Sequence, residues 1–130
     1  MGVIIKPYCN CGFTTKEIYL GGGMDTFESK CIIPFYCLDC KNIYSKNILY
    51  KNKESYSINH NIKCTNCNSQ LIMYGYIHEF DSREPQFEGI DDTIEWNPNI
   101  TTTYYLNRNN LYCPICEKNE LVFEELGLWD

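Results

Sequence analysis

Eight of the nine cysteines in this chain lie in four close pairs, and no other feature constrains its fold as strongly. The pairs are Cys9/Cys11, Cys37/Cys40, Cys64/Cys67 and Cys113/Cys116. Two cysteines separated by one or two residues turn both sulfurs toward one point, and two such pairs make a tetrahedral four-thiolate cage for a metal ion. The sequence therefore predicts two metal sites with these eight cysteines as ligands, and we expect Zn²⁺ in both.

Each pair is followed by a stretch of aliphatic and aromatic residues that predicts a β-strand. These stretches cover residues 13–20, 42–50, 70–80 and 120–126. The layout is that of a zinc knuckle, in which the chain turns tightly around the metal between two strands. The residue just past the second cysteine of such a turn has to tolerate a positive φ. Gly12 and Asn68 meet that need, whereas Lys41 and Glu117 fit it less well.

The four pairs, Gly12 and the turn Cys113–Cys116 (CPIC) resemble the zinc-ribbon and rubredoxin-like class of four-cysteine knuckles. The CPIC turn looks like the knuckle of that class without its usual glycine. The arrangement is also similar to small uncharacterised bacterial proteins with paired zinc ribbons. The resemblance implies four-cysteine metal sites and three-stranded sheets. It implies no activity, because a fold of this kind carries many functions.

The composition favours a mainly β protein made of two small units. Among 130 residues there are 11 Tyr and 6 Phe but no Ala, and Tyr, Phe and Ile favour strands over helices. Units of about half this length bury a modest core and often need a staple such as zinc. We therefore predict a first zinc ribbon over residues 1–55 and a second over residues 56–130, both built of short antiparallel strands.

Two ways of combining the four pairs remain open. In the sequential arrangement, the first two pairs hold one metal and the last two pairs hold the other. In the nested arrangement, the outer pairs share one metal and the inner pairs share the other. We favour the sequential arrangement, because consecutive elements usually neighbour each other in space.

Residues 81–98 form an acidic stretch that interrupts the second unit. It contains six carboxylates against a single Arg83, and Pro85, Gly89 and Pro98 punctuate it. We interpret it as a solvated loop in which a few apolar side chains, including Ile94 and Trp96, are tucked onto a sheet. The alternative is an arm that binds a basic partner surface.

Four other features offer little chemistry. The run of glycines at 21–23 lacks the residues of a phosphate loop and predicts the end of a strand. Cys31 is expected to be a buried small hydrophobe or a surface thiol, although it is also a candidate to replace Cys9 or Cys11 as a ligand. We expect His60 in an exposed loop and His78 on a strand, both without a functional role.

Charge and coordination together favour a binding module rather than an enzyme. Four-cysteine sites leave no open position for water or substrate, and no catalytic constellation is visible. The net charge is −6. A four-thiolate site with a divalent cation carries −2, so two of them would take the chain from −6 to −10. Acidity disfavours phosphate backbones, so we expect another protein as the partner.

Two alternatives stay open. Strand aromatics that stack on bases would suit a nucleic-acid-binding ribbon. Iron in the same cages would suit a rubredoxin-like electron-transfer protein. No secretion signal or spanning segment is visible, so we expect no membrane association and a cytoplasmic location, where thiols stay reduced.

Overall fold

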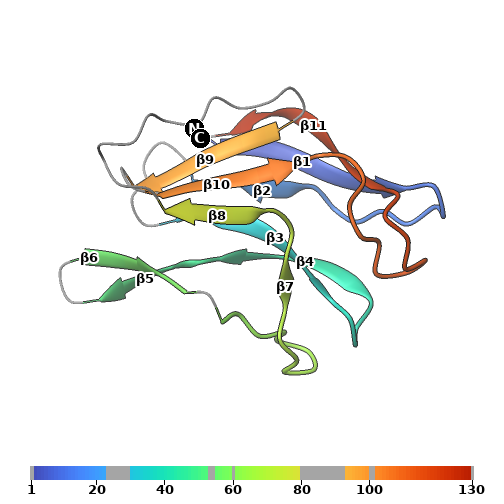
Figure 1. Cartoon of the computed structure of the whole chain (residues 1–130), viewed down its shortest axis with the longest axis horizontal. Helices are drawn as coiled ribbons and strands as arrows, with labels where there is room; N and C mark the ends of the chain where they lie inside the picture. Colours follow the sequence, from blue (N-terminus) through green and yellow to red (C-terminus); the bar gives the residue numbers. More distant parts are fainter. Residues whose placement is uncertain are drawn as a thin grey trace.

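The computed structural model describes residues 2–22, 30–52, 55–59, 61–79, 93–99 and 102–129, and it contains strands and no helix in those ranges (Figure 1). The mainly β prediction is therefore confirmed. The strands in this part of the chain are β1 (Gly2–Cys9), β2 (Ile18–Leu20), β3 (Ile32–Cys37), β4 (Asn42–Asn47), β5 (Leu49–Asn52), β6 (Ser55–Ile58), β7 (Ile72–Met73), β8 (Tyr76–Glu79), β9 (Thr93–Asn99), β10 (Thr102–Asn107) and β11 (Leu121–Trp129).

The strands form small antiparallel sheets. Three of these sheets are three-stranded, with the orders β11-β1-β2, β8-β10-β9 and β4-β3-β7, and β5 and β6 form a separate hairpin. A backbone bridge between Gly21 and Ile32 joins the end of β2 to the start of β3. Each predicted strand after a cysteine pair has a counterpart, which is β2, β4, the β7–β8 region or β11.

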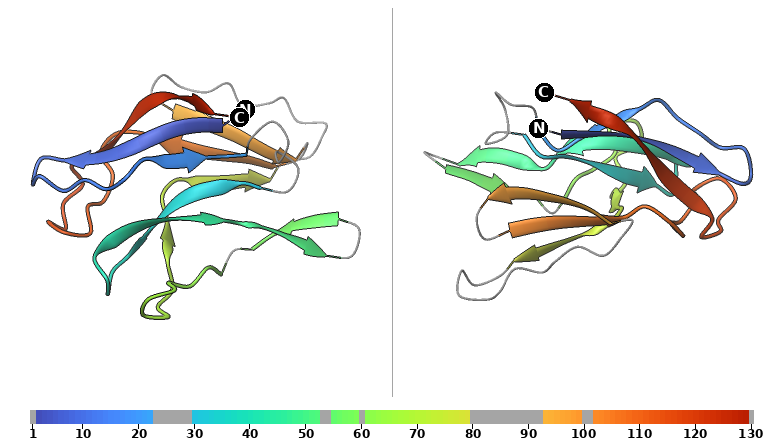
Figure 2. Two further views of the ribbon diagram at one scale, coloured as in Figure 1. Left: turned by 180° about the vertical axis from the view of Figure 1, so that it is seen from behind. Right: turned by 90° about the horizontal axis from the view of Figure 1, so that it is seen from above.

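The first and last strands of the described chain lie side by side. β1 pairs with β11 from Gly2 opposite Trp129 to Cys9 opposite Leu121, with one β-bulge near Ile4. Figures 1 and 2 show the two termini next to each other, at the end of the β1–β11 ladder away from the turn that follows β1. The pairing brings the first cysteine pair and the last one to the same end of one ladder.

The sheet β4-β3-β7 brings the two middle cysteine pairs together in the same way. β3 pairs with β4 along its whole length, from Ile32 opposite Asn47 to Cys37 opposite Asn42. On its other side β3 pairs with β7, where Tyr36 lies opposite Ile72. The turn that precedes β7 is thereby held beside the turn between β3 and β4.

A single core lies between these sheets. It includes Cys31, which is 0% exposed, and Tyr104 from β10, the middle strand of its sheet. Strands from the start, the middle and the end of the chain all contribute to this core. Its β-branched and aromatic side chains fill the space between sheets well. Other fully or almost fully buried members are Ile5, Leu20, Ile33, Phe35, Ile48, Leu106, Leu121 and Phe123.

Two sheets combine strands from both sides of residue 55. β11-β1-β2 does so, and β4-β3-β7 does so as well. The division of the chain into units at residues 1–55 and 56–130 stays a prediction, but the strand pairing does not follow that division.

The acidic stretch is more ordered at its end than the sequence suggested. Residues 93–99 form β9, so the interpretation of residues 93–98 as a loop is wrong, while residues 81–92 lie outside the described ranges. Ile94 is buried and Trp96 packs against the core, as expected of the apolar side chains of this stretch. The β9–β10 pairing explains the strand, because it satisfies the backbone groups of both segments.

Gly21 is required where β2 ends. Its φ is +89°, and a Cβ there would lie 2.7 Å from the ring of Trp96. The prediction that this glycine ends a strand is confirmed, since β2 stops at Leu20, and Gly23 lies outside the described ranges.

We predict that Gly21→Ala lowers the free energy of unfolding by about 1–3 kcal/mol, because it adds backbone strain and a clash with Trp96. Urea denaturation of the metal-loaded protein measures this change. Gly127→Ala is the matched control, since its Cβ would meet nothing within 4 Å, and its effect should stay within about 0.5 kcal/mol. Equal losses in the two variants would contradict the steric argument.

Candidate metal centres

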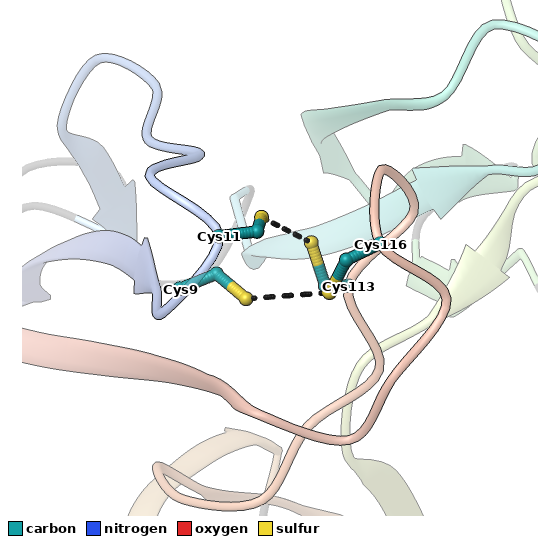
Figure 3. A group of neighbouring side chains, drawn as sticks. All are labelled: Cys9, Cys11, Cys113 and Cys116. Atoms are coloured by element: carbon teal, nitrogen blue, oxygen red, sulfur yellow. Dashed lines mark hydrogen bonds between the residues drawn. The ribbon is translucent and has the colours of Figure 1, made fainter.

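The first and fourth cysteine pairs converge in one group, which we call the outer centre (Figure 3). Cys9 ends β1, Cys11 follows in the next turn, and Cys113 and Cys116 come from the turn between β10 and β11. The Sγ atoms of Cys9 and Cys116 are 3.6 Å apart, and those of Cys11 and Cys113 are 3.8 Å apart. Residues more than 100 positions apart in the sequence thus share one point in space.

The second and third pairs converge in the inner centre. Cys37 and Cys40 come from the turn between β3 and β4, and Cys64 and Cys67 come from the turn before β7. The Sγ–Sγ distance is 3.4 Å from Cys37 to Cys67 and 3.6 Å from Cys40 to Cys64.

The sequential pairing favoured by the sequence is therefore wrong, and the nested alternative is the one found. Two strand pairings, and not proximity along the chain, decide which cysteine pairs come together. The pairing of β1 with β11 brings the outer turns together, and the pairing of β3 with β7 brings the inner turns together. The eight cysteines singled out by the sequence are the same ones that form the two groups, and Cys31 belongs to neither.

Each group is close enough to hold a metal ion. Within each centre the four Sγ atoms all lie within 4.8 Å of one another, and all nine cysteines are free thiols. A regular tetrahedron with metal–sulfur bonds of about 2.3 Å has edges of about 3.8 Å. The four Sγ–Sγ distances given above, from 3.4 to 3.8 Å, are close to that edge. A disulfide reading of the paired cysteines has no support here.

The turns of the centres share one backbone pattern. The carbonyl of the first cysteine accepts a hydrogen bond from the residue after the second one, at 2.9 Å in all four turns. The donors are the N–H groups of Gly12, Lys41, Asn68 and Glu117. In three turns the N–H group of the first cysteine also donates to a carbonyl just beyond the turn, that of Phe13, Ser69 or Lys118. The internal repeat read from the cysteine spacing is thus a repeat of backbone geometry.

All four residues past the second cysteine have a positive φ. The value is +94° at Gly12, +53° at Lys41, +61° at Asn68 and +60° at Glu117. The expectation for Gly12 and Asn68 is confirmed, while the reservation about Lys41 and Glu117 is wrong. The turn imposes the conformation on those two residues at a cost of about 1 kcal/mol each, since a Cβ crowds the backbone in that region.

Backbone N–H groups in the inner centre point at sulfur. The Cys40 N–H group lies 3.4 Å from Cys37 Sγ and donates to it. Burial opposes ionisation of Cys64, but the backbone N–H groups of Cys67 and Asn66 outweigh it and lower the pKa of that thiol to about 6. A turn that stabilises a thiolate prepares the ligand, because the thiolate and not the thiol binds the metal.

The outer centre shows the same balance between burial and backbone donors. The backbone of Phe13 lowers the pKa of the exposed Cys11 thiol. Burial instead raises the pKa of Cys9 to about 12, and burial also raises that of Cys113. A divalent cation would offset this burial penalty, since it supplies the positive charge that the buried sulfurs lack.

Tyr44 is a polar neighbour of the inner centre that sequence reasoning missed. Asn66 Nδ2 donates to its hydroxyl oxygen at 3.0 Å. Burial, followed by a hydrogen bond with Cys40, raises the pKa of the Tyr44 hydroxyl to about 12. The signal available in the sequence was an aromatic residue two positions into the strand that leaves the knuckle. A Ser69 hydroxyl that donates to the Asp39 carboxylate ties the two turns of this centre together.

Neither Cys31 nor His78 belongs to either cysteine group. Cys31 is a buried core residue, as one of the expectations had it, and burial raises its pKa to about 12. His78 lies exposed on β8, where it pairs with Thr103, and the strand assignment is confirmed. His60 lies outside the described ranges.

Comparisons of the chain with protein-family models, curated proteins and solved structures find no match. The likeness to the zinc-ribbon class therefore rests on the two cysteine groups alone. A search of the described residues for a helix long and apolar enough to cross a bilayer finds none.

We predict that Glu117→Gly raises the free energy of unfolding of the metal-loaded chain by roughly 0.5–1 kcal/mol, because glycine removes the strain of a positive φ. Urea denaturation measures the gain. Lys118→Gly is the neighbouring control without that geometry, and it should lower stability by a few tenths of a kcal/mol. Destabilisation by both variants would argue that the turn is not strained at Glu117.

Proposed function

We propose that this chain is a non-enzymatic protein-binding module in which two Zn²⁺ ions hold the binding surface in shape. The observation that carries the proposal is the convergence of eight sulfur atoms into two groups with the spacing of metal–thiolate tetrahedra. Four-thiolate tetrahedral sites are the usual setting of structural zinc, and they suit iron as well.

The ligand set supports a structural role for the metal. In each centre four cysteine sulfurs would occupy all four positions of a tetrahedral ion, which leaves none for water or a substrate. A bound zinc ion would supply positive charge and cross-linking, while the chain supplies the thiolates and the N–H groups around them. The absence of an open position is what separates this proposal from a zinc hydrolase.

The position of the centres explains what the metals would stabilise. The outer centre closes the ladder between β1 and β11, and the inner centre closes the sheet around β3. Zinc binding to small cysteine sites contributes about 10–16 kcal/mol, whereas the net stability of a whole domain is about 5–15 kcal/mol. The metals therefore decide whether the turns that carry the cysteines are ordered.

A protein partner is supported by apolar side chains at the tips of two cysteine turns. Leu38 is 52% exposed in the inner centre, and Ile115 is 46% exposed in the outer centre. The turns that carry the two centres lie at the same end of the molecule (Figures 1 and 2). Rigid turns with apolar tips suit protein recognition, and the net charge of −6 disfavours a phosphate backbone. Free thiols fit a cytoplasmic location for this activity.

We predict two metal ions per chain by elemental analysis, with zinc rather than iron as the element. Cys64→Ser should reduce the content to about one, because it removes a ligand of the inner centre. Cys31→Ser should leave the content at two, since Cys31 belongs to neither centre. Removal of both ions with a chelator should abolish most of the near-ultraviolet circular dichroism signal.

Other results of that experiment have a clear meaning. A folded wild-type chain without metal would refute the proposal for both centres. A visible absorption band from ferric thiolate would identify the bound metal as iron and would favour an electron-transfer function. A content that drops in the Cys31→Ser variant would show that the cysteine grouping is wrong.

We further predict that the double variant Leu38→Asp and Ile115→Asp loses its protein partner while keeping both metals, because charge at the turn tips opposes apolar contact. Affinity capture from nuclease-treated extract of the source cells, with quantitative mass spectrometry, measures the loss. Tyr50→Asp is the control, since Tyr50 is 48% exposed on the β5–β6 hairpin. Capture that depends on intact nucleic acid, or that is equal in both variants, would contradict a protein partner at the turn tips.

A further inference from the structure

We propose that the two centres bind metal cooperatively, and that Tyr36, Tyr74 and Tyr112 are the positioning residues that couple them. The inference rests on the proposed metal-binding function and goes beyond it. Tyr36 is the residue before Cys37 of the inner centre, and Tyr112 is the residue before Cys113 of the outer centre. A tyrosine thus directly precedes one cysteine turn of each centre.

The side chains of these two tyrosines are in contact with each other. The ring centroids of Tyr36 and Tyr112 are 5.1 Å apart, within the range of an attractive aromatic pair. Tyr74 packs on Tyr36 at 4.8 Å and meets Phe123 of β11 edge to face at 5.3 Å. One cluster thus joins a strand of the inner centre to a strand of the outer centre.

Tyr74 fixes the cluster with hydrogen bonds as well as packing. It is 3% exposed, and its hydroxyl donates to the Tyr112 carbonyl at 2.6 Å. Its N–H group donates to the Pro34 carbonyl of β3 at 3.1 Å, and its own carbonyl accepts a bond from the Tyr104 hydroxyl. Tyr74 is therefore bonded to β3, to β10 and to the backbone next to Cys113. A shift of either cysteine turn would disturb these bonds.

The coupling follows from order. Metal at one centre fixes its turn and with it the adjacent tyrosine, so half of the aromatic pair is already in place when the second metal arrives. The second centre then loses less conformational freedom on binding, which is positive cooperativity. An aromatic pair of this kind corresponds to a coupling of about two- to tenfold in affinity.

The test compares the affinity of the inner centre for Zn²⁺ with the outer centre intact and disabled. The full chain is used, with Cys9→Ser and Cys116→Ser to disable the outer centre, and a chromophoric chelator competes for the ion. We expect the inner centre to bind about two- to tenfold more weakly when the outer centre is disabled. In the Tyr112→Leu background this ratio should fall toward one, because the ring contact between Tyr36 and Tyr112 is lost.

Two variants separate coupling from general destabilisation. Tyr112→Phe keeps the ring and should restore the ratio, because it preserves the contact with Tyr36. The Tyr74 hydroxyl donates to the backbone carbonyl of residue 112, a bond that both substitutions leave in place. Tyr76→Leu removes a partner of a different aromatic pair, at 5.3 Å from Tyr105, and should leave the ratio unchanged. If Tyr112 had only a structural role, its substitution would lower the Zn²⁺ affinity of the inner centre by the same factor whether the outer centre is intact or disabled.

A second measurement covers the case in which the disabled variant does not fold. Native mass spectrometry of the wild-type chain with one Zn²⁺ per chain counts the species with no, one and two ions. Independent sites would place about half of the chains or more in the one-ion state, whereas coupling depletes it. Tyr112→Leu should repopulate that state.

The outcomes distinguish the two proposals. A wild-type chain that binds no metal refutes the proposed function itself. The coupling would be refuted if the inner centre bound Zn²⁺ equally well with the outer centre intact and disabled. It would also be refuted if the difference in affinity persisted in the Tyr112→Leu variant. Either result would leave the metal sites in place.

Discussion

The structure depends on four sulfur atoms meeting at one point, twice, from turns that are far apart in the sequence. The outer group lies where β1 ends and β11 begins, and the inner group lies beside the turn between β3 and β4. The sheets are small, and most of them have three strands. Small sheets bury little apolar surface, and a metal ion held by four thiolates would add a constraint on the orientation of their turns.

The sequence singled out the eight cysteines that form the two groups, because close spacing along the chain is a local signal. Spacings of one and two residues between cysteines say that both sulfurs face one point, whatever the fold around them. The strands after each pair were visible for the same reason, since their aliphatic and aromatic content lies next to the cysteines. Gly12 and Asn68 were recognised at the positive φ positions because both residue types tolerate them.

The parts that failed depend on distant partners. Nothing in residues 2–9 reveals that they pair with β11, and this ladder together with the β3–β7 pairing decides between the nested and the sequential grouping. Lys41 and Glu117 adopt a positive φ because the turn requires it, so their own preference is overruled. Residues 93–99 include the end of the acidic stretch and contain a proline, yet they form a strand that pairs with β10. Tyr44 reads as an ordinary strand residue until its contact with Asn66 is seen.

The nesting of the two centres fixes an order of events during protein synthesis. The sulfurs of the inner centre are separated by at most 30 positions in the contacts they make, whereas Cys9 and Cys116 are separated by 107. A ribosome that adds about 5–20 residues per second therefore completes the four cysteines of the inner group several seconds before those of the outer group. During that interval Cys9 and Cys11 are outside the exit tunnel without their partners.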